Sequence, residues 1–300
     1  MNDNKNKNIS KWIIVMLATV MLLGIAMVLI ALNNQKTTID DYDSLADGYV
    51  TVNLNLPVET PDFNLTNEPV SDETPEEEIN QEIPEPQETI NSVETYTFSY
   101  TGDWKDQANV DLLSLREQYP EIIGWIFFEN DSINYPIMYS GDDTKYLRTL
   151  YNGNPSIAGS VFLEGLNNTD FSDAHTVIYG HNMANGTMFG KLGKYLRQPN
   201  YYDYHKYFQI FCINEEGKVV KKRYEVFAVC KVSMYDSVYT ICSDGDDTFA
   251  NLVDTLQNGS LLKTGVSASV SDRVVSLSTC TRGEQRVLVS AVLVDEYICD

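Results

Sequence analysis

The most pronounced hydrophobic feature of the chain is an uncharged, predominantly apolar run at residues 12–32. A run of about twenty apolar residues is long enough to cross a bilayer as a helix. Lys5, Lys7 and Lys11 precede the run, so the positive-inside rule places residues 1–11 in the cytoplasm and the rest of the chain outside. The apolar core of a cleaved signal peptide is shorter, about 7–15 residues. We therefore expect an uncleaved, single-pass anchor in the cell membrane.

A different pattern dominates the second half of the chain, where short runs rich in β-branched and aromatic residues follow one another. Most are separated by Gly, Asn, Asp or Pro, as strands joined by turns are. The runs are residues 133–139, 159–163, 176–179, 207–213, 223–232, 273–277 and 286–294. Seven or eight such strands predict a closed or nearly closed β-barrel.

Helical periodicity interrupts this pattern in two places. Residues 109–125 place Leu and Ile near helical spacing, and Pro120 divides them into two short predicted helices. Residues 247–262 keep a second apolar stripe, with Asp247 or Thr248 as the cap. The fold class is therefore mainly β with flanking helices, in one domain at residues 96–300.

The charge of the chain is unevenly distributed. The formal net charge is −22, and most of the imbalance lies in residues 33–95, where Lys36 is the only basic residue. This segment also holds six of the ten prolines and few aromatic residues, so it lacks the apolar surface needed to offset the entropy of ordering. We expect a disordered acidic stalk between membrane and domain. Clustered Lys and Arg are missing, which argues against nucleic acid as a partner.

The five cysteines are an odd number, so at least one thiol stays unpaired. Cys212 and Cys230 lie within apolar runs, where a buried structural role is expected. The sequence has no C-x-x-C motif, and residues 244–247 lack the ligand spacing of a calcium loop. We therefore expect neither a metal nor a cofactor.

Cys280 stands out because an apolar run leads directly into it and polar residues follow. Arg282 and Arg286 bring positive charge close to this thiol, which favours the nucleophilic thiolate. A second apolar run, at residues 176–179, ends at Gly180 and delivers His181 at its mouth. His181 is thus the candidate proton-transfer partner, whereas His175 and His205 fit surface or packing roles better.

These residues carry a family resemblance. Residues 276–280, SLSTC, resemble the T-L-x-T-C signature of sortases, and residues 179–183, YGHNM, resemble their histidine strand. Further segments resemble class B sortases in particular, and the likeness covers residues 109–300. The segments are INYP at 133–136, GSVFL at 159–163 and NGTMFG at 185–190.

The resemblance implies a sortase-type barrel of seven or eight strands with N-terminal helices and a helix before the cysteine strand. It also implies a cysteine transpeptidase. Cys280 would attack a C-terminal sorting signal of a surface protein, and an amine of a peptidoglycan precursor or a pilin lysine would resolve the thioester. His181 would be the general acid or base. The family's arginine opens the strand after the cysteine, which fits Arg286, with Arg282 as the alternative.

Two neighbours of the cysteine are candidate substrate-binding residues. Ser278 lies on the same side of the strand as Cys280 under the period-two alternation of side chains. An ordinary strand serine is the other reading of Ser278. The backbone N–H of Thr279 is a candidate second donor to a developing oxyanion.

Two other function classes fit parts of the sequence. A wall-directed cysteine peptidase or amidase would also use Cys and His outside the membrane, although papain-like sites place the Cys before the His in sequence. A stalked binding module would keep Cys280 only as a structural residue. The order of His181 and Cys280 favours the transpeptidase.

Overall fold

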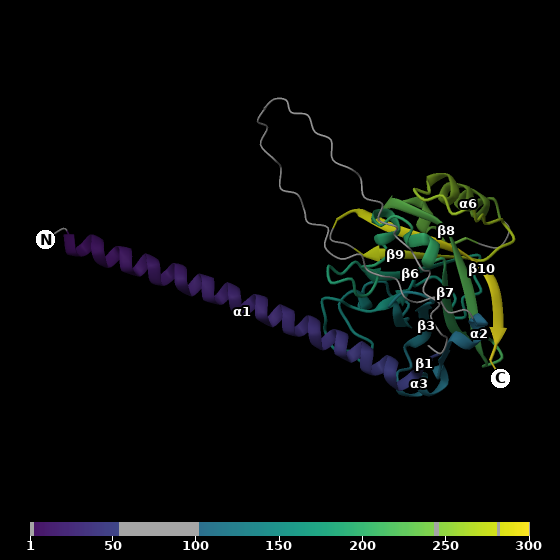
Figure 1. The fold of residues 1–300 in the computed structure, drawn as a ribbon, viewed down its shortest axis with the longest axis horizontal. Helices are drawn as coiled ribbons and strands as arrows, with labels where there is room; N and C mark the ends of the chain where they lie inside the picture. Colours follow the sequence, from purple (N-terminus) through teal and green to yellow (C-terminus); the bar gives the residue numbers. More distant parts are fainter. Residues whose placement is uncertain (1–2, 54–101, 243–245, 281–282, 300) are drawn as a thin grey trace, which may run out of the picture.

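The computed structural model describes residues 3–53, 102–242, 246–280 and 283–299. Among these residues, eight strands close into a barrel in the order β10-β8-β7-β3-β4-β5-β6-β9 (Figure 1). The strands are β3 (Ile122–Phe128), β4 (Asn134–Met138), β5 (Val161–Leu163), β6 (His175–His181), β7 (Tyr207–Ile213), β8 (Val219–Ser233), β9 (Val274–Cys280) and β10 (Gln285–Ile298). The predicted β-barrel is confirmed.

The pairing of the strands is mostly antiparallel. Two pairs are parallel, β4 with β5 and β6 with β9. The predicted limits of β7 agree with the structure, whereas β8 and β10 are longer than the sequence indicated because their ends pair with each other beyond the apolar run. The main core cluster lies inside the barrel. It includes Ile178 of β6 and Leu277 of β9, which are opposite each other in the sheet.

One predicted helix is wrong. The second half of residues 109–125 does not form a helix after Pro120 but enters β3, all seven residues of which are buried. A strand covered on both faces shows no alternation of apolar and polar residues, so its pattern cannot be told from that of a short buried helix. Gly124 marks the close packing, because a Cβ there would lie 2.7 Å from the carbonyl oxygen of Phe211 on β7.

Short helices surround the barrel, and one longer helix precedes the cysteine strand as predicted. This helix, α6 (Asp247–Gly259), is capped by the Asp246 side chain, which accepts the N–H of Phe249 at 2.7 Å, rather than by Asp247 or Thr248. The short helices are α2 (Trp104–Gln107), α3 (Leu112–Gln118), η1 (Lys145–Leu147), α4 (Lys194–Arg197), α5 (Tyr201–Tyr204) and η2 (Ser237–Tyr239).

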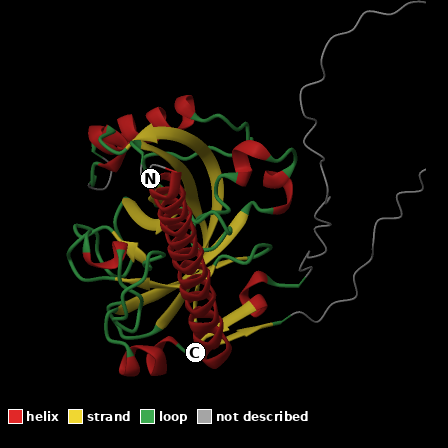
Figure 2. Ribbon diagram, turned by 90° about the vertical axis from the view of Figure 1, so that its left-hand side faces the viewer, coloured by secondary structure: helices red, strands yellow, loops and turns green. Residues whose placement is uncertain are grey.

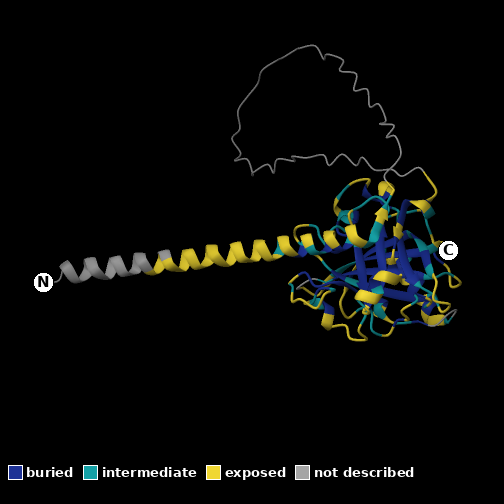
Figure 3. Ribbon diagram, turned by 90° about the horizontal axis from the view of Figure 1, so that it is seen from below, coloured by how far each residue is buried: buried dark blue, intermediate teal, exposed yellow. Residues whose placement is uncertain are grey.

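The N-terminal helix α1 (Asp3–Tyr49) projects from the barrel and is exposed along most of its length (Figures 1 and 3). Its described apolar side chains between Met16 and Leu32 are exposed. In the part of the chain that the structure describes, α1 is the one helix long and apolar enough to cross a bilayer. These features are compatible with the predicted membrane anchor.

The C-terminal end of α1 packs on the barrel, which corrects the predicted limits of the stalk. Tyr42 and Leu45 are 3% and 5% exposed, and strand β1 (Val50–Val52) follows the helix directly and pairs with β2 (Ala108–Val110). Residues 33–53 are therefore ordered, and in Figure 2, where α1 points toward the viewer, the helix overlaps the barrel only in projection. The rest of the predicted stalk lies outside the described residues.

The pairing of β1 with β2 changes the role expected for the acidic segment that the sequence assigned to a stalk. Residues 53 and 102 flank the part of the chain that the structure does not describe, and the N–H of Asn53 donates to the carbonyl of Gln107 at 2.8 Å. Both ends of the intervening segment are therefore attached to the domain, so the segment does not separate the domain from the anchor. The sequence could not show this, because the strands that hold the two ends are three residues long.

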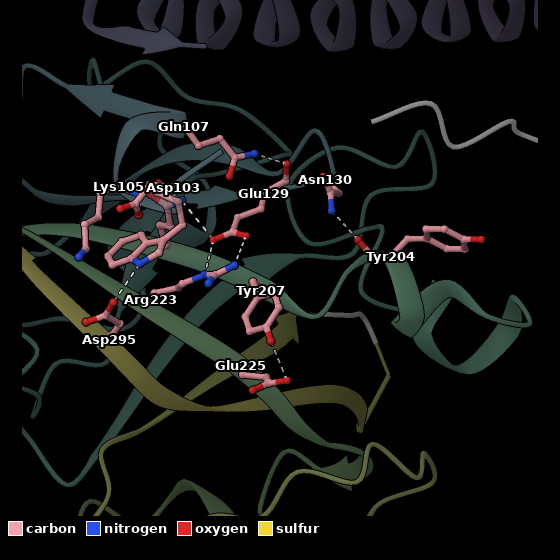
Figure 4. A network of polar contacts seen from close by, with 12 residues as sticks. Asp103, Lys105, Gln107, Glu129, Asn130, Tyr204, Tyr207, Arg223, Glu225 and Asp295 are labelled. Carbon is pink, nitrogen blue, oxygen red and sulfur yellow. Dashed lines mark hydrogen bonds and ion pairs between the residues drawn. The ribbon is translucent and has the colours of Figure 1, made fainter. Parts of the chain in front are cut away.

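A polar network ties the segment around α2 and β2 to the barrel (Figure 4). Arg223 on β8 donates two hydrogen bonds of 2.7 Å to the carboxylate of Glu129, and Gln107 donates to the Glu129 carbonyl. Nearby, the buried Lys221 donates to the carbonyl of Ala108 at 2.9 Å and to Asn109 Oδ1 at 2.7 Å. The β1–β2 pair is thus fixed to β8 by charged donors.

We expect Glu129→Gln to lower the free energy of unfolding by about 2 kcal/mol, because the Arg223 guanidinium loses its counter-charge where Glu129 is 9% exposed. The measurement is chemical unfolding of the full chain in detergent micelles. The matched control is Glu121→Gln, whose pair with Lys145 is half-exposed and should contribute less than about 1 kcal/mol. Equal losses in the two variants would contradict the structural role of Glu129.

Candidate active site

The parallel pairing of β6 and β9 brings Cys280 and His181 together. Their register places His181 opposite Cys280 at the ends of the two strands. The two residues are 99 positions apart in sequence, and the carbonyl of Cys280 accepts the N–H of Asn182, the residue after His181, at 3.1 Å. Because parallel strands end at the same edge of a sheet, both side chains reach one mouth of the barrel. The two candidates found from sequence therefore lie in one site.

Gly180, between the histidine and the apolar part of β6, allows this edge to pack tightly. A Cβ at this position would lie 2.7 Å from the ring of Phe189. Phe189 is fully buried, and its N–H donates to the carbonyl of His181 at 2.9 Å. The close packing of Phe189 thus explains why position 180 holds a glycine.

Burial controls the ionisation of the Cys280 thiol. It raises the pKa of Cys280 to about 11, while the positive charge of Arg286 and a hydrogen bond from the backbone of Gly180 act in the opposite direction. The thiol is therefore protonated at neutral pH in this resting arrangement. Nucleophilic attack requires a group that takes the proton, and His181 is the titratable side chain that the fold places next to it.

The His181 ring is oriented by two backbone carbonyls. Nε2 lies 2.8 Å from the carbonyl oxygen of Leu147, at the end of η1, and Nδ1 lies 3.3 Å from that of Cys280. Carbonyl oxygens only accept hydrogen bonds, so a neutral ring with one N–H satisfies one of them and a doubly protonated ring satisfies both. The two carbonyls thus fix the orientation of the His181 ring at the end of β6.

Arg286 is the second residue of β10 and lies opposite Val232 of β8. Its guanidinium donates to the carbonyl of Gly283 and lies 3.8 Å from the sulfur of Met234. The positive charge lowers the pKa of both Cys280 and Tyr239, although burial outweighs it in each case. Arg286 is therefore close enough to act electrostatically on the thiol, whereas Arg282 lies outside the described residues.

The two candidate substrate-binding residues differ in their contacts. Ser278 is 1% exposed and its hydroxyl lies 2.8 Å from the hydroxyl of Tyr239. Thr279 is fully buried, and its hydroxyl accepts the N–H of Val287 at 2.9 Å, one residue after Arg286. The Thr279 side chain therefore positions the start of β10, and any contact with substrate falls to its backbone.

Sequence reasoning missed two groups at this site. Tyr239 of η2 lies beside Ser278, and its ring centroid is 6.1 Å from that of Tyr179, whose hydroxyl donates to Glu164 at 2.7 Å. The carbonyl of Leu147 is the second group. Neither stands in a recognisable motif, because η1 and η2 are single turns placed by tertiary contacts. Among the described residues, no cluster of three or more His, Cys, Asp or Glu side chains has the arrangement of a metal site.

His175, His205, Cys212 and Cys230 are buried away from this site. His175 and His205 are 0% and 2% exposed, and burial lowers the pKa of His175 to about 4. Cys212 and Cys230 are buried, as predicted, and burial raises their pKa values. Buried neutral groups of this kind contribute to packing rather than to chemistry.

Comparison with known proteins gives one consistent result. A profile described as a sortase domain matches residues 129–294. Sortase B of Listeria monocytogenes is 30% identical over 207 residues, covering 68% of this chain and 79% of the relative. The structure of sortase B from Bacillus anthracis in complex with AAEK1 has a TM-score of 0.55 and 31% identity and covers 61% of this chain and 83% of that one. A Staphylococcus aureus sortase B–substrate complex has a TM-score of 0.55 and 26% identity, and the match covers 61% of this chain and 84% of that one.

The raised pKa of Cys280 predicts how fast the thiol reacts. Iodoacetamide alkylates the thiolate, so we expect the rate at Cys280 to rise about tenfold per pH unit from pH 7 to about pH 10. Arg286→Ala should slow the reaction at every pH below about 11, because the variant loses the charge that lowers the pKa. Peptide-resolved mass spectrometry distinguishes Cys280 from the other thiols. A rate independent of pH would show that the thiolate already predominates.

Proposed function

This chain belongs to the sortase family of cysteine transpeptidases, in class B, and from that premise we propose that it cleaves the C-terminal sorting signal of surface proteins and transfers them to an amine of the cell wall. The observation that supports this activity best is the pairing of His181 with Cys280 across β6 and β9. The relatives covered by the comparisons are sortases B, and one of them is described in complex with substrate.

The proposed reaction has two balanced steps. The Cys280 thiol gives its proton to His181 as the sulfur forms a bond to the carbonyl carbon of the scissile peptide; the C–N bond then breaks, and His181 passes this proton to the departing amine. The product is a thioester with the N-terminal part of the substrate. An acceptor amine then attacks the thioester and loses a proton to His181, which returns the proton to the Cys280 sulfur as the C–S bond breaks.

Arg286 is the proposed donor to the developing oxyanion. Its location at the start of β10, its electrostatic effect on Cys280 and its place in the family resemblance support this role. The Thr279 backbone N–H is the proposed second donor, and Ser278 with Tyr239 would line the substrate side. A guanidinium suits the role because it stays charged and presents several donors in one plane.

The proposed location is the outer face of the cell membrane. Residues 1–11 would lie in the cytoplasm and residues 12–32 in the bilayer, with the catalytic domain outside, because the lysines precede the span. The exposed apolar part of α1 supports this arrangement. The acceptor would be an amine of a peptidoglycan precursor or a pilin lysine.

The test of the proposed function is cleavage of a library of fluorescence-quenched sorting-signal peptides by the full chain in detergent micelles. We expect cleavage of a subset of sequences and a covalent enzyme–peptide adduct that hydroxylamine releases, as a thioester requires. Cys280→Ala and His181→Ala should each lose at least about 10³-fold in rate. Cleavage by Cys280→Ala would contradict the mechanism, and its unfolding by circular dichroism would make the cysteine structural.

The arginine assignment has its own test. Arg286→Ala should lose about 10²–10³-fold in kcat/KM, because one donor to the oxyanion is missing. Arg286→Lys should stay impaired, since an ammonium cannot reproduce the planar fork of donors. Arg282→Ala is the control and should remain within a few-fold of the wild type. A crippled Arg282→Ala with an active Arg286→Ala would transfer the role to Arg282.

A further inference from the structure

The C-terminal part of α1 enters the core of the catalytic domain instead of ending at its surface. Tyr42 belongs to the same buried cluster as the side chains inside the barrel. Its hydroxyl donates to the carbonyl of Gly159 at 3.0 Å and lies 2.9 Å from the hydroxyl of Ser160. Burial raises the pKa of Tyr42 above the ordinary range for a tyrosine. Tyr42 is thus an internal residue contributed by the helix that carries the apolar span.

A continuous set of contacts leads from Tyr42 toward the catalytic pair. The Tyr42 ring meets that of Tyr135 on β4 edge to face, with centroids 5.4 Å apart. The Tyr135 hydroxyl accepts the N–H of Met188 at 3.1 Å. Met188 in turn pairs with Asn182 in an isolated bridge, next to His181. Tyr42 therefore supports, through one ring and one hydrogen bond, the loop that follows the catalytic histidine.

The loop after His181 contains an uncommon backbone conformation that its neighbours must hold in place. Met188 has a backbone φ of 53°, in the left-handed region that non-glycine residues rarely adopt. Such a conformation is unfavourable for a residue with a Cβ and persists only when neighbours hold it. The hydrogen bond from the Met188 N–H to Tyr135 is one such restraint. Losing it would free the loop that carries the Asn182 N–H and the Phe189 N–H, which hold Cys280 and His181 by their carbonyls.

A shallow cavity lies at the same junction. It is lined by side chains of α1, by Tyr135 and by the loop after His181, including Thr38, Ile39, Met183 and Met188. The helix and the loop therefore meet across an incompletely filled space. Tyr42 is 3% exposed beside this space, and its ring is the aromatic contact that α1 makes with Tyr135 there.

We propose that Tyr42 is a positioning residue of the active site, through which the membrane-anchor helix holds the His181 loop in its catalytic arrangement by way of Tyr135 and Met188. The idea deepens the proposed function and rests on it for the choice of substrate. Tyr42 lies ten residues beyond the end of the apolar run, about 15 Å along a helix. The anchor would thus fix both the height of the active site above the bilayer and its internal geometry.

The test uses the full chain in detergent micelles with three variants. Tyr42→Ala removes the ring, Tyr42→Phe keeps it, and Leu45→Ala truncates a buried residue of the same helix that packs in a different cluster. We expect Tyr42→Ala to lower kcat about tenfold with KM changed less than threefold. Tyr42→Phe and Leu45→Ala should keep kcat within about twofold, even where Leu45→Ala lowers the melting temperature as much as Tyr42→Ala does.

A fourth variant keeps the inference falsifiable if Tyr42→Ala does not fold. Tyr135→Phe removes only the hydroxyl that accepts the Met188 N–H, and we expect it to lower kcat about threefold or more without a comparable loss in melting temperature. Unchanged kcat in Tyr135→Phe would overturn the proposal. So would a loss in Leu45→Ala equal to that in Tyr42→Ala, because the effect would then reflect general undocking of the helix.

A readout without substrate separates this inference from the proposed function. The rate of Cys280 alkylation by iodoacetamide should change at least about threefold in Tyr42→Ala and remain unchanged in Tyr42→Phe. If no peptide is cleaved by the wild type, the proposed function fails while the alkylation result still decides the role of Tyr42. Equal alkylation rates in all variants would overturn the positioning role even if peptides are cleaved.

Discussion

The parallel pairing of β6 with β9 is the interaction on which the rest of the structure depends. Seven consecutive pairs in one register, from His175 with Val274 to His181 with Cys280, bring two distant side chains to one edge of the barrel. Parallel neighbours need a long crossover, and here the connection contains β7, β8 and α6. A slip of one residue would turn Cys280 to the opposite face. The closed barrel prevents such a slip, because β9 is also paired with β10.

The closed barrel also affects the ionisation of Cys280, because it buries the thiol at the end of β9. A thiol at a strand end of a filled barrel is largely desolvated, and its pKa rises to about 11. Arg286, at the start of the neighbouring strand, and the backbone of Gly180 oppose this shift without reversing it. Burial therefore favours the neutral form of the Cys280 thiol, next to a histidine whose ring contacts two carbonyl acceptors. In the proposed mechanism, proton transfer from this thiol is consequently part of the reaction.

The N-terminal helix is held to the barrel by packing at its C-terminal end. Tyr42 fills a position in the barrel core, and the β1–β2 pair closes the chain behind it. Buried contacts of this kind transmit constraint because protein interiors have few voids into which a side chain can relax. The C-terminal part of α1 and the loop after His181 are consequently joined through Tyr42, Tyr135 and Met188, while Arg223 and Glu129 tie β8 to the end of β3.

The sequence by itself determined the β-barrel class, most strand locations, the helix before Cys280, the candidate anchor and the two candidate catalytic residues that the fold brings together. These features follow from local patterns: period-two alternation, helical stripes, and polar residues directly after apolar runs. The family resemblance added Arg286, which the strand pattern alone did not separate from Arg282. Where burial is two-sided, as in β3, the local pattern failed, because a strand without a solvent face shows no alternation.

Only the tertiary structure decided the contacts of residues 33–53, which composition had assigned to a stalk. The segment is polar and acidic overall, yet Tyr42 and Leu45 are buried. Its end forms the three-residue strand β1, which pairs with the three-residue strand β2 at residues 108–110. Three residues carry too little pattern to predict pairing with a partner more than fifty positions away. The same reason hid Tyr239 and the Leu147 carbonyl, which reach the site on single helical turns. Their locations depend on what the rest of the chain packs against them, and no local pattern encodes that.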